Sequence, residues 1–276
     1  MKVLFLLGLV ASVYSLGYHE DIGIPEYARL RNGEAVSSRI IGGFPTKSTQ
    51  HTYAVGVLVT LRTGQLSVCG GTILSQHRIL TAAQCWYDGY NQGKKMIIRY
   101  GSPRLFGGNS RDVIGVDIHP NFDPLIPIHD IAVLSVNYNM YFGDYAQPVM
   151  LPTKNDVNKT FTGVGAHIVG YGKTGDWSPI GPAQVRQSVS VPVVSIWNCY
   201  ETFGYYDPEK QMCTQGNAWG ACTGDVGGPL VIKNYFNGTD LLIGVTSLVS
   251  PVGCDNGFPN GYTRVTYYLD WILSQL

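Results

Sequence analysis

The segment GDVGGPL, residues 224–230, looks built to present a nucleophile at its centre. Covalent catalysis by a side chain requires a group such as a serine hydroxyl, a cysteine thiol or a lysine amine. The central residue is Val226, whose side chain has no proton to release and no lone pair with which to attack. Either the likeness to a reactive segment is an accident, or a reactive site has been lost.

Composition and charge exclude several classes of protein. The chain has 276 residues, of which 45% are hydrophobic and 14% charged, as in a globular protein rather than a disordered chain or a coiled coil. Its 19 Lys and Arg balance its 19 Asp and Glu, so no net field attracts nucleic acid or an anionic membrane. No segment offers the continuous apolar run of a membrane span. We therefore expect neither nucleic acid nor membrane as a partner.

The chain begins like a secreted protein. Met1 and Lys2 precede the apolar run VLFLLGLVASVY, and small residues follow at the positions that a signal peptidase reads. We predict a signal peptide over residues 1–15 and an extracellular protein; the alternative is an ordinary buried strand or helix. Secretion permits disulfides, and the six cysteines are an even number, but the count alone allows fifteen pairings.

The rest of the chain has two parts that differ in composition and periodicity. Residues 16–39 are polar, of mixed charge and without periodicity, which predicts an exposed leader ending in Arg39. From Ile40 onward, short β-branched and aromatic runs alternate with turn residues, which predicts an all-β barrel or sandwich. The last twelve residues carry apolar side chains at helical spacing and predict a C-terminal helix. The runs are residues 52–61, 94–101, 112–120, 130–136, 166–172, 187–194, 229–233 and 241–249, and the helical positions are Tyr268, Leu269, Ile272, Leu273 and Leu276.

Several motifs together resemble the trypsin-like serine proteases. They occur in the family's order: RIIGG (39–43), CGGTILSQHRILTAAQC (69–85), DIAVL (130–134), GYG (170–172), GDVGGPL (224–230) and GYTRV (261–265). The resemblance implies an all-β fold, a double six-stranded β-barrel of the chymotrypsin type with a C-terminal helix, over a protease domain at 40–276. It also implies a site between the barrels and the disulfides Cys69–Cys85, Cys199–Cys213 and Cys222–Cys254.

The resemblance also implies that the catalytic residues are degenerate. The family carries histidine where this chain has Gln84 and serine where it has Val226, so only Asp130 remains. A glutamine amide cannot act as a base near neutral pH. Losing base and nucleophile costs roughly 10⁶ in kcat, whereas an oxyanion-hole remnant at Gly224 and the N–H of Val226 contributes about 10³–10⁴ over water. We expect no working protease, and a structural Asp130 that accepts hydrogen bonds from backbone N–H groups and Ser247.

Other histidines are poor substitutes for the missing base. His129 adjoins Asp130, but neighbours in an extended segment point to opposite faces. We expect His77, His119 and His167 to lie in loops or strands elsewhere.

The resemblance further implies a blocked specificity pocket. Gly220 stands where trypsin-like members carry an acidic residue at the pocket base, and Leu248 replaces the usual tryptophan of the wall. Val249 and Asn260 replace glycines that leave the pocket open in many members. These side chains should partly fill the pocket.

The remaining features concern processing and partners. Cleavage after Arg39 would free Ile40 to pair with Asp225, as in zymogen activation; the alternative is that both are inherited and unused. Asn158 and Asn237 begin N-glycosylation sequons. Loops 86–93, 173–181 and 200–210 are rich in Tyr, Trp and Gly, as in aromatic anchors for binding, or as in ordinary surface loops. Cysteine spacing and glycine content indicate no metal and no cofactor.

We therefore expect a secreted, zymogen-like pseudoprotease that acts by binding proteins. The pattern resembles the inactivated group 3 allergen-like protease paralogues of parasitic mites, for which the implied partners are host plasma proteins, especially complement components. The alternatives are regulation of an endogenous protease cascade, residual hydrolysis through unrecognised residues, and a decoy for protease inhibitors, against which the blocked pocket argues.

Overall fold

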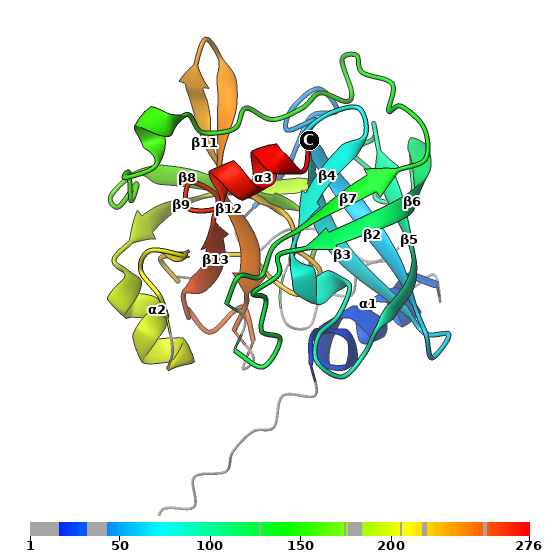
Figure 1. Cartoon of the computed structure of the whole chain (residues 1–276), viewed down its shortest axis with the longest axis horizontal. Coiled ribbons are helices and arrows are strands. Elements are labelled where there is room, and N and C mark those ends of the chain that lie inside the picture. Colours follow the sequence, from blue (N-terminus) through cyan, green and yellow to red (C-terminus); the bar gives the residue numbers. More distant parts are fainter. Residues whose placement is uncertain are drawn as a thin grey trace, which may run out of the picture.

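A computed structural model describes residues 17–31, 43–126, 128–173, 175, 184–204, 206–216, 220–250 and 253–276. Two antiparallel β-barrels stand side by side, as the sequence predicted (Figure 1). The N-terminal barrel closes in the order β2-β3-β4-β7-β6-β5. Its strands are β2 (Ala54–Leu61), β3 (Leu66–Ile73), β4 (Arg78–Thr81), β5 (Gly93–Tyr100), β6 (Asn109–Ile118) and β7 (Ala132–Val136).

The C-terminal barrel follows the order β8-β9-β10-β13-β12-β11 and closes because β8 pairs with both β9 and β11. A short strand, β1, is added beside β9. The strands are β1 (Phe44–Pro45), β8 (Gly165–Gly170), β9 (Gln187–Val194), β10 (Gln211–Thr214), β11 (Pro229–Phe236), β12 (Thr239–Leu248) and β13 (Asn260–Arg264).

Side-chain periodicity explains these strands. In β9 the valines at 189, 191 and 193 are buried, while the residues between them are exposed or half-buried, as period-two alternation requires. β2 is buried on both faces at Gly56, because Leu105 lies so close that a Cβ on that glycine would be 2.2 Å from its Cδ1. The apolar positions of the predicted strands are therefore those that face the interior of the two barrels.

The helices are few and short. They are α1 (Ile24–Arg31), α2 (Ile196–Phe203) and α3 (Leu269–Ser274), with single 3₁₀ turns at Ala83–Cys85 and Lys154–Asp156. The predicted C-terminal helix is present. Of its predicted apolar positions, Tyr268, Leu269 and Ile272 are buried, whereas Leu273 and Leu276 are each 48% exposed. Among the described helices, none has the length and apolar character needed to cross a membrane.

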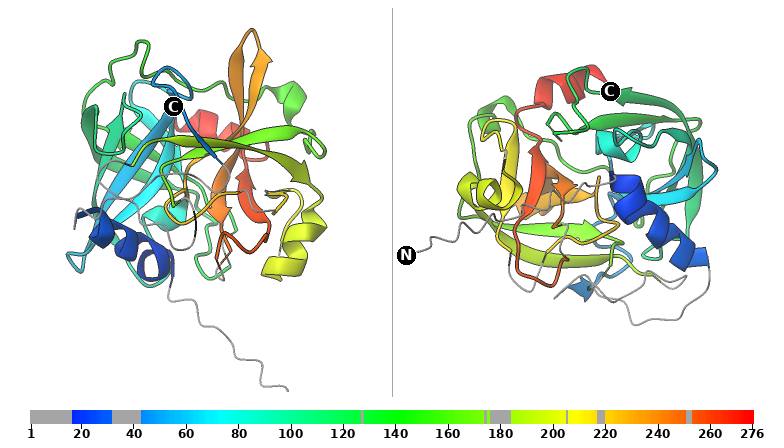
Figure 2. Two further views of the ribbon diagram at one scale, coloured as in Figure 1. Left: turned by 180° about the vertical axis from the view of Figure 1, so that it is seen from behind. Right: turned by 90° about the horizontal axis from the view of Figure 1, so that it is seen from below.

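The expectation of an exposed leader is wrong for Gly17, Tyr18, His19 and Gly23, which are buried, whereas Glu20, Asp21 and Ala28 are exposed. A π-helical segment, His19–Gly23, continues into α1, and both pack against the N-terminal barrel at β3 (Figures 1 and 2). Tyr18 is 6% exposed and His19 is fully buried. The segment is too short and too polar for an amphipathic period to reveal this docking, which depends on single contacts. The predicted signal peptide, Arg39 and Ile40 lie outside the described residues.

All three predicted disulfides are present. The Cα–Cα separations are 6.2 Å for Cys69–Cys85, 5.9 Å for Cys199–Cys213 and 5.4 Å for Cys222–Cys254. The first fixes the turn that carries Gln84, and the third ties the segment before Val226 to the loop before β13. Bridges closing loops of this size stabilise a fold by roughly 2–4 kcal/mol each.

Candidate functional site

The site lies where the two barrels meet, and its first element is a contact between Gln84 and Asp130. Gln84 belongs to the 3₁₀ turn Ala83–Cys85, which follows β4. Asp130 immediately precedes β7 and is fully buried. The backbone N–H of Gln84 donates to Asp130 Oδ1 over 2.9 Å, and its side-chain Nε2 donates to Oδ2. Both carboxylate oxygens are thereby occupied from one residue.

The C-terminal barrel completes this network through Ser247 in β12. The hydroxyl of Ser247 donates to Asp130 Oδ2 over 2.6 Å, and Gln84 Nε2 also donates to the Ser247 carbonyl over 2.9 Å. The hydrogen bonds predicted for Asp130 are thus confirmed. Burial raises the pKa of Asp130, while the bonds from Ser247 and Gln84 oppose that rise. The carboxylate is held as a structural group within a fully bonded network.

Val226 occupies the turn between two glycines of positive φ. Gly224 has φ 95° and Gly227 has φ 84°, so the backbone follows a path that side-chain-bearing residues rarely adopt. The Val226 carbonyl accepts a hydrogen bond from Gly70 N over 2.7 Å and lies 3.7 Å from Cys85 Sγ. Val226 is 1% exposed and packs in the main core. The position at which the family carries serine is therefore filled by a buried apolar side chain.

Asn260 lies beside Gly220, as the sequence predicted for the specificity pocket. Its Oδ1 accepts from Ala221 N over 2.9 Å and its Nδ2 donates to Ala221 O over 3.2 Å. A Cβ placed on Gly220 would be only 2.4 Å from Asn260 Oδ1. The amide of Asn260 thus bridges β13 to the segment before Val226, in the space next to Gly220.

The side chains of the two other predicted pocket residues pack against the interior of the C-terminal barrel. Val249 is 9% exposed and belongs to the main core. Leu248 packs against the cluster of Cys199, Tyr206 and Cys213. Both side chains therefore consolidate the C-terminal barrel around the pocket region.

Asp225 is a buried carboxylate that receives two backbone donors. Gly172 N donates to its Oδ1 over 2.8 Å and Cys222 N to its Oδ2 over 3.0 Å. Burial raises the pKa of Asp225 to about 7, although these bonds act in the opposite direction. A cation placed beside this carboxylate would favour its ionised form and lower this pKa.

The histidines near the site are engaged elsewhere. His129 is not extended, as the sequence suggested, but has φ 56°. Its ring stacks on His119 at a centroid distance of 4.8 Å, and its Nδ1 lies 2.9 Å from Tyr268 Oη. Burial lowers the pKa of both histidines. The left-handed backbone turns His129 into this aromatic cluster, which also contains Trp271.

A second polar cluster was not foreseen from the sequence. His51 Nδ1 lies 2.6 Å from Tyr53 Oη, and Tyr53 Oη donates to Asp240 Oδ2 over 2.7 Å. Burial would raise the pKa of Asp240, but hydrogen bonds from His51, Asn234 and Tyr53 lower it to about 2. No motif joins these residues, because Asp240 lies far along the chain and is brought in by β12. His51 and nearby His167 line a cavity of about 400 Å³ that lies against β1 and β9.

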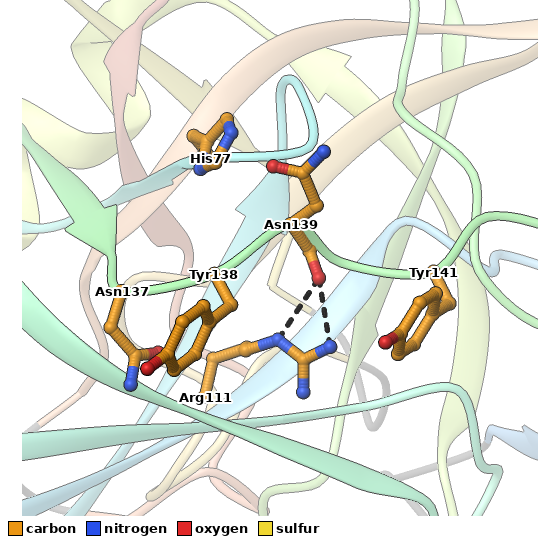
Figure 3. Close-up of a pocket in the computed structure, with 6 residues that line it drawn as sticks. All are labelled: His77, Arg111, Asn137, Tyr138, Asn139 and Tyr141. Atoms are coloured by element: carbon orange, nitrogen blue, oxygen red, sulfur yellow. Dashed lines mark hydrogen bonds between the residues drawn. The ribbon is translucent and has the colours of Figure 1, made fainter.

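A hollow of about 480 Å³ on the N-terminal barrel is lined by none of the site residues described above (Figure 3). Arg111 forms its floor, donating from Nε and Nη2 to the Asn139 carbonyl over 3.1 and 2.8 Å. The guanidinium also lies 5.1 Å from the ring centroid of Tyr141. The remaining lining residues are His77, Asn137 and Tyr138.

The remaining predictions concern the glycosylation sequons, the aromatic loops and metal binding. Both sequon residues, Asn158 and Asn237, are exposed. Tyr90 and Tyr200 from the aromatic loops are 58% and 46% exposed, whereas residues 176–183 lie outside the described part of the chain. Within the described ranges, no group of three or more His, Cys, Asp or Glu side chains could hold a metal ion.

The whole arrangement matches proteins of known family. Residues 40–272 match the trypsin family. The collagenase of Hypoderma lineatum is 30% identical, covering 99% of this chain and 97% of that protein, and serine protease 1 of Drosophila melanogaster is 33% identical, covering 86% and 85%. The solved structure of HL collagenase superposes with a TM-score of 0.74 at 28% identity, covering 86% of this chain and 98% of that one. The chain therefore belongs to the trypsin family of serine proteases and their homologues.

Proposed function

We propose that this chain is a secreted pseudoprotease that acts by binding other proteins. The observation that carries the proposal is that the side-chain amide of Gln84 is bonded to Asp130, while Val226, where the family carries serine, is buried in the core. Acyl transfer in this family requires an imidazole that takes a proton from a hydroxyl. An amide held by a carboxylate cannot accept that proton, and a buried isopropyl group has none to give.

The neighbouring pocket supports the same proposal. The Asn260 amide bridges to Ala221 beside Gly220, where a substrate side chain would have to enter. A substrate would have to displace two buried hydrogen bonds and would find no acidic group at Gly220 to compensate. Substrate binding and chemistry are thus weakened by separate features of the same site.

Binding would then depend on exposed surfaces. Trp197 and Tyr200 project from α2, with exposed fractions of 66% and 46%, and their rings meet edge to face at 5.6 Å. Aromatic residues of this kind are enriched among the residues that dominate binding energy at interfaces. We take this pair as the principal candidate anchor, and the hollow of Arg111 and Tyr141 as the second.

We propose secreted or plasma proteins as the partners, complement components among them. This proposal rests on the resemblance to the inactivated mite paralogues and on the predicted signal peptide. An endogenous protease cascade of the secreting organism is the other candidate. The first proposal places the partner in host plasma, and the second places it in the secreting organism.

The first experiment asks whether the chain hydrolyses anything. The protein, cleaved to begin at Ile40, is assayed on Lys, Arg and aromatic peptide substrates and, because one relative is named a collagenase, on native collagen. A fluorophosphonate probe tests for a reactive serine. We expect no turnover and no labelling; turnover that disappears in Asp130→Ala would overturn the proposal in favour of a residual hydrolase.

The second experiment identifies the partner. Immobilised protein is exposed to vertebrate plasma, and a complement lysis assay is run in parallel with Trp197→Ala/Tyr200→Ala and with the matched control Phe236→Ala, whose side chain is 62% exposed on β11. Retention of a complement component with suppressed lysis, lost only in the α2 variant, supports the host-cascade proposal. Absence of both would overturn that proposal and leave an endogenous partner.

A further inference from the structure

The segment before the predicted cleavage point is bound to the N-terminal barrel by buried contacts. Tyr18 Oη donates to the Val68 carbonyl, and His19 Nδ1 lies 2.9 Å from Ser67 Oγ, both partners lying in β3. His19 N donates to Asp88 Oδ2 over 2.7 Å. Tyr18, His19, Ser67 and Asp88 are all buried. We define Ser67, Val68 and Asp88 as the leader-docking face.

The leader-docking face is shaped for this occupant. A Cβ placed on Gly23 would lie 1.7 Å from Ser67 Oγ, so only glycine allows the helical segment to approach β3 this closely. Asp88 is already fixed by its own loop, since Tyr90 N and Asn91 N donate to its Oδ1 over 3.0 and 2.6 Å. Its second oxygen is thereby directed at His19. The acceptor of the His19 N–H is therefore held in place by hydrogen bonds from its own loop.

We propose that residues 17–31 stay on the leader-docking face as a separate, noncovalently bound chain after cleavage between the leader and the barrels, and that acidification releases them. No cysteine occurs in residues 16–39, so no disulfide can hold the leader once the chain is cut. Retention must therefore come from the contacts of Tyr18, His19 and the neighbouring helix.

The acid release follows from the surroundings of His19. Among the described residues no hydrogen-bond partner reaches its buried Nε2. A neutral ring can leave that nitrogen without a proton, whereas a protonated ring would bury an N–H without an acceptor. The charged group facing it is Asp88, from the loop after the 3₁₀ turn; β3 contributes only the Ser67 hydroxyl, and Glu20 on its own segment is exposed.

The pKa of His19 determines whether acid strengthens or weakens docking of the leader. Burial lowers the pKa of His19 to about 4, against the opposing charge of Asp88. A released leader would titrate near 6.5, so it binds more protons than the docked leader between these values. Docking is therefore fully stable above about pH 6.5 and weakens as pH falls towards 4. From these two values, affinity at pH 4.5 should be roughly 50- to 100-fold lower than at pH 7.5.

The test uses the whole chain with residues 35–39 replaced by the enteropeptidase recognition sequence, so that cleavage leaves Ile40 as the new N-terminus. After cutting, gel filtration and mass spectrometry determine whether the leader peptide co-elutes with the barrels at pH 7.5 and at pH 4.5. We expect co-elution at pH 7.5 and loss at pH 4.5. Loss of the leader already at pH 7.5 would overturn the proposal.

Three variants separate the causes. His19→Gln should bind independently of pH, whereas the exposed control Glu20→Gln should follow the wild type. Gly23→Leu should release the leader at both pH values without affecting the barrels; retention would show that the leader-docking face is misidentified. If His19→Gln releases its leader with the wild-type pH profile, the acid-release mechanism is wrong. Should His19→Gln fail to fold, the profile of the cut wild type decides, since release must begin below about pH 6.5.

Discussion

Gln84 holds Asp130 from two directions, with its backbone N–H on one carboxylate oxygen and its side-chain amide on the other. The amide also reaches the Ser247 carbonyl in the opposite barrel. Gln84 therefore fixes a buried carboxylate between the barrels, as a hydrogen-bonded histidine does in an active serine protease. It does so with a group that does not titrate.

Replacing Gln84 should reveal how much the network stabilises the fold. Gln84→Ala removes one donor from a buried carboxylate and one from a carbonyl, and we expect a loss of about 2 kcal/mol in the free energy of unfolding, measured in urea at pH 7.5. The loss should shrink in acid, because burial already raises the pKa of Asp130 and a protonated acid needs fewer donors. Gln84→His, which can still donate, should lose less. An Ala variant as stable as wild type would show that the amide contributes nothing.

Restoring the reactive groups should not by itself restore peptide hydrolysis. Gln84→His with Val226→Ser supplies a base and a hydroxyl beside Asp130, but Asn260 still bridges to Ala221 beside Gly220. We expect the double variant to remain inert towards peptide p-nitroanilides, and a triple variant with Asn260→Gly to gain at least about tenfold in kcat/KM, or about 1.4 kcal/mol, on apolar substrates. Rapid cleavage by the double variant after Lys or Arg would refute the blocked pocket.

Opening the pocket should cost stability even without chemistry. Asn260→Gly removes both hydrogen bonds to Ala221 and adds backbone freedom at the first residue of β13, which together should lower the free energy of unfolding by about 2 kcal/mol. For a chain of this size that corresponds to a fall of roughly 4–8 °C in Tm. Asn260→Ala, measured beside it in a thermal scan, separates the lost bonds from the glycine effect. Unchanged stability in both variants would mean that the bridge is not formed in solution.

Cleavage after Arg39 should change how stability depends on pH through Asp225. In the structure its pKa is raised to about 7 by burial, so the ionised form costs stability, and this cost grows as pH rises from about 4 to 7. If the new ammonium of Ile40 pairs with Asp225, the cost is removed while the amine stays charged, below about pH 8. The cleaved protein should therefore gain Tm over the intact chain between pH 5 and 7.5. This gain must vanish in Asp225→Asn, and its persistence there would rule out the pairing.

The sequence predicted the fold through motifs more than through strand patterns. The runs at 187–194 and 241–249 match β9 and β12 closely, because their valines and leucines alternate or fill the barrel interior. β3 gives no such signal, since Gly70 and Gly71 interrupt it. The backbone approaches the other barrel at Gly70, and side chains of its own barrel crowd it at Gly71. No strand run was therefore predicted at residues 66–73, although the CGGTIL motif overlaps them.

Some parts of the candidate site could be predicted from sequence motifs and others could not. Gln84, Asp130 and Val226 could be identified from motifs, and the bond from Ser247 followed from the family fold. The Asn260 bridge could be expected only as bulk in a pocket, because its hydrogen bonds depend on the exact approach of β13 to Ala221. Docking of His19 could not be predicted, since its partners Ser67 and Asp88 are about fifty and seventy residues away and belong to no shared pattern.

At residue 226 the two barrels are joined by a main-chain hydrogen bond. Gly70 N–H bonds to the Val226 carbonyl, and the backbones pass so closely that a Cβ on Gly70 would lie 2.8 Å from Gly228 Cα. This hydrogen bond uses the carbonyl of residue 226 rather than its side chain, so it does not depend on the residue type at this position. A substitution at residue 226 would therefore keep this bond between the barrels, so the fold tolerates any change there that the buried space can accommodate.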